Sequence, residues 1–158
     1  MTAQTPFRLV IVDDHELLAA TLSMALRLSG LDVETVAGPS TEAVVATVRR
    51  RAPVLVLLDL DLGPPLGSGL DLIPPLIECG GRVVMMTGVD DRARLGACVE
   101  AGAAGIVSKS SGFESLLDTV HRAVDGEELL TDRDRACFLR VFRAERPAVS
   151  ADTGCLAP

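Results

Sequence analysis

The sequence has no tryptophan and no tyrosine, and only four phenylalanines among its 158 residues. Aromatic rings are the platforms on which nucleic-acid bases stack, so such platforms are largely missing here. Positive charge is also scarce, because 15 Lys and Arg residues face 22 Asp and Glu residues and give a formal net charge of −7. Binding to a phosphate backbone depends on Lys and Arg, so we do not expect this chain to hold DNA by itself.

Long apolar runs and clustered cysteines are missing as well. No run reaches the ~18 residues that span a bilayer, and the N-terminus lacks the basic region and apolar stretch of a signal peptide. Four cysteines, Cys79, Cys98, Cys137 and Cys155, are scattered without a CxxC pair. This spacing favours free thiols over a disulfide or a metal site. We therefore expect a cytoplasmic chain with no membrane partner.

Five short apolar runs alternate with segments of helical periodicity. Continuous apolar runs are typical of strands that are covered on both faces, and strict alternation indicates a parallel sheet between two layers of helices. The predicted fold class is therefore α/β, a flavodoxin-like doubly wound (βα)5 with strand order 2-1-3-4-5. The expected strands are 7–12, 32–36, 54–58, 82–87 and 104–108, and the clearer helices are 14–29, 41–51, 92–101 and 112–125.

The segment that would form the third helix and the segment after residue 126 depart from this regular pattern. Pro74 and Pro75 fall inside the segment that would form the third helix, which we therefore expect to be short, kinked or displaced. Ser111 and Glu114 form the pattern of a capping box at the start of the last regular helix. We expect one domain over 1–126, and a linker over 127–158 that contains an extra helix at 131–145 and a flexible tail.

Polar residues follow four of the five predicted strands. Strands 1 and 3 flank the point where the chain reverses its winding direction, so the side chains after them meet at one edge of the sheet. Crowded carboxylates repel one another, and Mg²⁺, which prefers oxygen ligands, relieves that repulsion. A carboxylate can itself attack phosphorus, and a lysine can pair with the phosphoryl group. The residues in question are Asp13, Asp14, Asp59, Asp61, Thr87 and Lys109.

The histidines carry less information. We expect His15 to be an exposed residue of the first helical turn and His121 to be a surface or packing residue. Two histidines at this separation predict neither a catalytic triad nor a zinc site. Asp13 and Asp14 have a second interpretation, which is that they simply cap the first helix.

Four motifs at these positions resemble the receiver domain of bacterial two-component response regulators. They are IVDDH (11–15), LLDLDLG (57–63), VVMMTG (83–88) and GIVSKS (105–110). The resemblance covers roughly residues 7–126. It implies that Asp59 accepts a phosphoryl group from a sensor histidine kinase. It also implies a Mg²⁺ site formed by Asp13, Asp14, Asp59 and the backbone carbonyl of Asp61.

The resemblance assigns further roles around the phosphoryl group. Thr87 resembles the hydroxyl that bonds the group after transfer, Lys109 resembles the lysine that pairs with it, and Gly88 leaves room for it. Ile106 stands at the position where many receivers have a switching aromatic residue. The added charge is then expected to bias a bistable face built from the fourth helix, the fifth strand and the fifth helix.

The segment 101–130 resembles receivers that carry a LuxR-type helix-turn-helix output domain. Residues 127–158 are too few for a linker and such a domain, so we expect transcription control and DNA contact only through an output domain missing from this chain. A homodimer is a possible partner state.

Other functions stay open at this stage. Ile106, a longer loop after Asp59 and the interrupted third helix favour an atypical receiver that acts as a phosphorylation-independent dimerisation or protein-binding module. Asp59 and Asp61 also match the Asp-x-Asp motif of haloacid-dehalogenase-like phosphohydrolases, although that family usually carries the motif near the chain start. The leading hypothesis is a phospho-accepting signalling domain and not an enzyme with a substrate of its own.

Overall fold

Strands and helices alternate along the chain in the computed structural model, which describes residues 7–88 and 90–145. Each of the five strands of the central sheet coincides with a predicted apolar run to within one residue at either end. The elements are β1 (Arg8–Val12), α1 (Glu16–Leu28), β2 (Asp32–Val36), α2 (Thr41–Arg51), β3 (Leu55–Asp59), β4 (Asp61–Gly63), β5 (Gly67–Ser68), the short 3-10 helix η1 (Gly69–Leu72), α3 (Ile73–Glu78), β6 (Arg82–Thr87), α4 (Arg92–Ala101), β7 (Gly105–Ser108), α5 (Phe113–Val124) and α6 (Asp132–Glu145).

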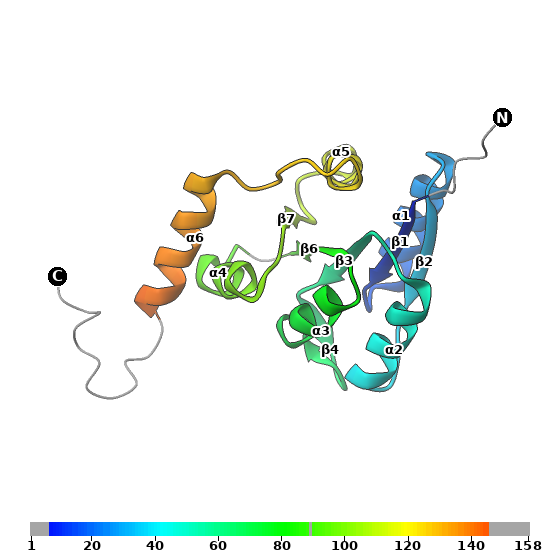
Figure 1. Ribbon diagram of the computed structural model, residues 1–158, viewed down its shortest axis with the longest axis horizontal. Coiled ribbons are helices and arrows are strands. Elements are labelled where there is room, and N and C mark those ends of the chain that lie inside the picture. The colour runs from blue at the N-terminus through cyan, green and yellow to red at the C-terminus, as the bar shows by residue number, and fades with distance from the viewer. Residues whose placement is uncertain (1–6, 89, 146–158) are drawn as a thin grey trace.

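The central sheet has five parallel strands in the order β2-β1-β3-β6-β7 (Figure 1). Since β6 and β7 are the fourth and fifth strands of the regular pattern, the predicted order 2-1-3-4-5 is confirmed. Strand β3 lies in the middle and pairs with β1 on one side and β6 on the other. All five of its residues are buried, which explains its continuous apolar sequence.

Helices cover both faces of the sheet. In β1, Leu9 and Ile11 pack with α1 and α5, while Val10 and Val12 pack on the opposite side with α2, α3 and α4. The alternation follows from the two-residue period of a strand. Burying these two apolar layers is the main source of stability, at about 25 cal/mol per Å² of apolar surface.

The loop after β3 contains an element that was not predicted. β4 and β5 form a small antiparallel hairpin before η1. The third helix is short, as expected, and it begins only at Ile73. Pro74 and Pro75 therefore fall in its first turn, where a missing backbone N–H costs little.

Side chains cap two of the helices. Ser40 caps α2 by accepting a hydrogen bond from the Ala43 N–H at 3.1 Å, and Asp91 caps α4. The capping box predicted for α5 is wrong. Gly112 is the N-cap residue, and the Ser111 hydroxyl instead donates to the Ser108 carbonyl at 2.7 Å.

The predicted extra helix is present as α6 and lies along α4 (Figure 1). Phe138 of α6 packs against the core on the α2, α3 and α4 side. The Arg92 guanidinium of α4 lies 5.5 Å from the centre of the Phe138 ring. The predicted flexible tail falls within 146–158, outside the described residues, and the domain boundary near Gly126 stays a prediction.

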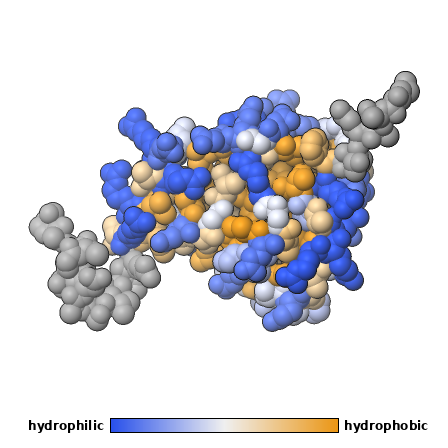
Figure 2. All heavy atoms as spheres, in the orientation of Figure 1, coloured by the Kyte–Doolittle hydropathy of each residue, from blue (hydrophilic) through white to orange (hydrophobic). Residues whose placement is uncertain are grey.

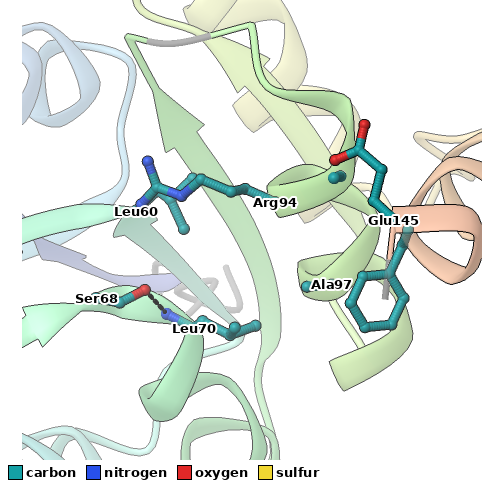
Figure 3. A pocket seen from close by; sticks show the side chains of 8 residues that line it. Leu60, Ser68, Leu70, Arg94, Ala97 and Glu145 are labelled. Carbon is teal, nitrogen blue, oxygen red and sulfur yellow. Dashed lines mark hydrogen bonds between the residues drawn. The ribbon is translucent and has the colours of Figure 1, made fainter. Parts of the chain in front are cut away.

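A cavity of about 260 Å³ lies between the hairpin segment, α4 and α6. Leu60, Ser68 and Leu70 bound it on one side, and Arg94, Ala97 and Glu145 bound it on the other (Figure 3).

Figure 2 shows apolar atoms in the middle of this view of the molecule and hydrophilic side chains around them. Among the residues that the structure describes, none of the helices combines the length and apolar character that a membrane span requires.

Candidate functional site

The candidate site lies at the carboxyl ends of the central strands. The chain leaves β1 toward the α1 face of the sheet and leaves β3 toward the α3 face, so the winding direction reverses between these two strands, which is where ligands bind in sheets of this kind. Asp13 and Asp14 follow β1, Asp59 is the last residue of β3, and Lys109 follows β7. Strand topology alone thus brings these residues to one place.

Asp59 and Lys109 form the central contact of the site. The Lys109 Nζ lies 2.8 Å from Asp59 Oδ2 and 3.5 Å from Asp13 Oδ1. Asp59 is only 2% exposed, and the Asp13 side chain is fully buried. Asp14 differs, because its side chain is 43% exposed at the rim. A buried carboxylate is costly without a partner, and the lysine supplies one.

Thr87 and Gly88 lie at the same edge of the sheet. Thr87 ends β6 and is buried, and its carbonyl accepts a hydrogen bond from the Lys109 N–H at 2.7 Å. This bond fixes the start of the loop that carries the lysine. Gly88 follows, and a Cβ placed there would meet no atom within 4 Å. Space is therefore open beside the threonine.

Asp61 is placed with its carboxylate away from the buried cluster. Its backbone N–H donates to Asp59 Oδ1 at 3.1 Å, while its carboxylate pairs with Arg94 Nη2 at 2.7 Å. The extra negative charge that the sequence places beside Asp59 is thus matched by a guanidinium from α4. The backbone of Asp61 therefore still contacts Asp59, the phosphoacceptor candidate.

The two buried carboxyls differ in their affinity for a proton. Burial raises the pKa of Asp59, hydrogen bonding and repulsion from Asp13 raise it further, and Lys109 offsets only part of the effect. Burial acts the same way on Asp13, but hydrogen bonds with Asp59 and His15 outweigh it and hold the pKa of Asp13 below its usual value. Asp13 therefore keeps its negative charge more readily than Asp59 does.

We expect this asymmetry to appear in stability when metal is absent. At pH 7 and in EDTA, Asp59→Asn should raise the free energy of unfolding by about 1 kcal/mol, and Asp13→Asn should lower it by a similar amount. Asp59 has a raised pKa, so its charge opposes folding, and the gain should shrink as the pH falls through that raised pKa and be lost by about pH 4, where the wild-type Asp59 of the folded state is protonated. Urea unfolding of the three proteins across this pH range measures both effects. Destabilisation by both substitutions would contradict the assignment.

The oxygen atoms of the site fit a divalent cation. Asp13 Oδ2 is buried and has no hydrogen-bond partner in the described part of the chain. A buried carboxylate oxygen left in this way is costly unless a cation satisfies it. Asp14 adds a second carboxylate at the rim, and the ligand atoms of Asp13, Asp14 and Asp59 lie within 4.8 Å of one another. These residues suit the all-oxygen coordination that Mg²⁺ prefers.

His15 is a site residue that the sequence analysis missed. Its side chain is exposed, as expected. His15 is the N-cap residue of α1, but its imidazole makes no capping hydrogen bond. Nδ1 lies 3.0 Å from Asp13 Oδ1 and 3.2 Å from Asp59 Oδ2. The hydrogen bond to Asp13 raises the pKa of His15. Its place directly after two acidic residues was the only signal in the sequence. Asp13 and Asp14 themselves do not cap α1 with their side chains.

Ile106 lies on β7 and is partly buried against the core on the α2, α3 and α4 side. It pairs in register with Met85 of β6. Its side chain therefore belongs to the layer that contacts α4, and its function as a switch stays a prediction.

Comparison with known proteins identifies the family. Residues 9–121 match the family model described as the response regulator receiver domain. The nitrate/nitrite response regulator protein NarP of Escherichia coli is 32% identical over 136 residues, which is 84% of this chain and 62% of NarP. The related protein NarL is 27% identical over the whole of this chain and 73% of its own length. The chain thus spans less than two thirds of NarP.

Solved structures agree on the fold. A two-component response regulator of the LuxR family from Aurantimonas sp. SI85-9A1 has a TM-score of 0.70 at 24% identity, covering 89% of this chain and 100% of that one. A CheY-like receiver domain protein from Methanospirillum hungatei JF-1 has a TM-score of 0.68 at 22% identity, covering 77% and 96% of the two chains. The chain therefore belongs to the response regulator receiver domain family.

Proposed function

We propose that Asp59 accepts a phosphoryl group from a sensor histidine kinase in a Mg²⁺-dependent reaction in the cytoplasm. The observation that carries this proposal is the contact of 2.8 Å between Lys109 Nζ and the buried Asp59 Oδ2 at the end of the central strand. A lysine at this position can pair with a phosphoryl group once one is attached to the carboxylate.

The transfer replaces one bond to phosphorus with another. An Asp59 carboxylate oxygen forms the new P–O bond, while the P–N bond of a phosphohistidine donor breaks and its electron pair returns to the histidine nitrogen. Negative charge accumulates on the phosphoryl oxygens during this step. Lys109 is placed to neutralise part of it, and the Thr87 hydroxyl is proposed to donate a hydrogen bond to the group after transfer.

The metal would be held by Asp13, Asp14, Asp59 and the backbone carbonyl of Asp61. When bound, Mg²⁺ supplies positive charge that offsets the carboxylates and the incoming phosphoryl oxygens. Gly88 offers the open space that the group needs, since no atom lies within 4 Å of a Cβ built there.

The output of the domain is proposed from its relatives. NarP and NarL are nitrate/nitrite response regulators, and the chain resembles receivers of LuxR-type regulators, so control of transcription through a DNA-binding output domain outside this chain is proposed from that resemblance. The added phosphoryl charge, about −1.5 to −2, would bias the face formed by α4, β7 and α5. Ile106 lies on β7 within that face.

Intact-mass spectrometry after incubation with acetyl phosphate tests the proposal. We expect the wild-type chain to gain the mass of one phosphoryl group with Mg²⁺ and to gain none in EDTA. Asp59→Asn should abolish the gain. Asp61→Asn is the matched control, because it removes a neighbouring carboxylate and keeps the backbone carbonyl, so labelling should persist.

Labelling that survives in Asp59→Asn would contradict the assignment of the phosphoacceptor. Absence of labelling, together with amide spectra that do not change in Mg²⁺ and beryllofluoride, would contradict phosphorylation and favour the phosphorylation-independent module. Turnover of a generic phosphomonoester would instead favour the phosphohydrolase.

A further inference from the structure

The His15 imidazole lies among the carboxylates of the site. Its Nδ1 is 3.0 Å from Asp13 Oδ1, 3.1 Å from Asp14 Oδ1 and 3.2 Å from Asp59 Oδ2. The Lys109 Nζ is a fourth neighbour at 3.1 Å. His15 also holds its backbone in this position, because its N–H donates to Asp13 Oδ1 at 2.9 Å.

A single hydrogen bond accounts for only one of these contacts. A ring nitrogen carries either one proton or one lone pair, so Nδ1 can donate to one carboxylate or accept one proton from Lys109. In either form, at least two of the three carboxylate oxygens, which lie 3.0–3.2 Å from the nitrogen, receive no proton from it. A metal ion bound by both the imidazole nitrogen and the carboxylate oxygens removes the conflict.

The spacing of these atoms matches that of ligands around a single metal ion. Adjacent ligands of a six-coordinate metal with bonds of about 2.1 Å lie about 3 Å apart. The ligand atoms of Asp13, Asp14, His15 and Asp59 all lie within 4.8 Å of one another. The buried Asp13 Oδ2, which lacks a hydrogen-bond partner within the described residues, independently indicates a bound cation.

We propose that His15 Nδ1 is a metal ligand in this site, and that it raises the affinity of the site for first-row transition-metal dications relative to Mg²⁺. Imidazole is a favoured ligand of metals such as Ni²⁺ and Zn²⁺, whereas Mg²⁺ prefers oxygen ligands and is reluctant to lose its water. The inference rests on the metal site of the proposed function and adds one nitrogen ligand to its oxygen set.

Pulsed electron paramagnetic resonance of the Mn²⁺-loaded chain reads the nitrogen ligand directly. The wild-type protein should show modulation from a coordinated ¹⁴N nucleus, and His15→Gln should lose it while still binding Mn²⁺. The sequence contains one other histidine, and His121→Gln is therefore the matched control that should keep the signal. Persistence of the modulation in His15→Gln, or its absence from the wild type, would overturn the inference.

Isothermal titration calorimetry provides the second measurement. His15→Gln should weaken Ni²⁺ binding at least about tenfold and change Mg²⁺ binding by less than about threefold. Equal losses for the two metals would overturn the preference. Failure of this inference is distinct from failure of the proposed function. Mg²⁺-dependent labelling of Asp59 without a nitrogen signal removes only the His15 ligand, whereas absence of labelling removes the phosphoacceptor assignment.

Discussion

Replacing Gly69 with alanine should lower the free energy of unfolding by roughly 3 kcal/mol and disturb the end of β3, which carries Asp59. A Cβ at this position would lie 2.2 Å from the Asp59 carbonyl oxygen and 3.3 Å from Leu58 Cγ. The backbone has little freedom to retreat, because the Gly69 N–H donates to the Leu60 carbonyl at 2.7 Å. The clash is therefore with the main chain that carries Asp59, and a change of side-chain rotamer does not relieve it.

The same substitution should reduce phosphoryl labelling of Asp59 by about tenfold or more, since reacting groups tolerate little misplacement. Gly88→Ala is the matched control for stability, because a Cβ there meets no atom within 4 Å and the unfolding free energy should change by less than about 0.5 kcal/mol. Urea unfolding and intact-mass labelling of both variants give the two readouts. A Gly69→Ala protein as stable as the control would show that η1 can shift away from β3.

The sheet order and much of the site could be predicted because both follow from the pattern of apolar and polar residues within short segments of the chain. The run Leu55–Asp59 is apolar until its last residue, so a buried strand that ends in a carboxylate was visible in the sequence. Parallel topology then places the ends of β1, β3 and β7 together, which is how Asp13, Asp59 and Lys109 meet. Local periodicity was sufficient for these features.

The features that the sequence did not predict depend on where a side chain points or on contacts between separate segments of the chain. The periodicity of α1 predicts an exposed His15, and its 59% exposed side chain agrees, yet the ring points toward three carboxylates from two strand ends. The capping box of α5 failed because the N-cap residue is Gly112, so Ser111 stands one residue too early to cap the helix. The β4–β5 hairpin lacks an apolar alternation long enough to be recognised as two strands.

The packing of α6 on α4 is a further long-range feature, and it depends on Gly96. A Cβ at Gly96 would lie 2.2 Å from the Phe138 carbonyl oxygen and 2.6 Å from Phe142 Cβ, both in α6. The absence of a side chain on α4 therefore allows the two helix backbones to approach closely. No residue of α6 is fully buried, so its attachment depends on this one face and on contacts such as the one from Arg92 Nη1 to Cys137 Sγ at 3.4 Å.

Gly96→Ala should consequently detach α6 while leaving the receiver sheet folded. Alanine favours the interior of α4 by about 0.5–1 kcal/mol over glycine, so α4 itself should not be weakened. A detached helix of 14 residues is marginal in water, and its amides should lose most of their protection from hydrogen exchange. Hydrogen-exchange mass spectrometry should show faster exchange across α6 and unchanged exchange in β3.

Glu100→Ala is the matched control, because Glu100 is an exposed residue of the same helix and its loss should leave α6 protected. Unchanged protection of α6 in Gly96→Ala would show that the helix pair can separate slightly without undocking. Loss of protection throughout the sheet would show that α6 is an integral part of the domain. The expected pattern, confined to α6, would establish that α6 docks on α4 because residue 96 is a glycine. The same helix α4 carries Arg94, which pairs with Asp61 beside Asp59.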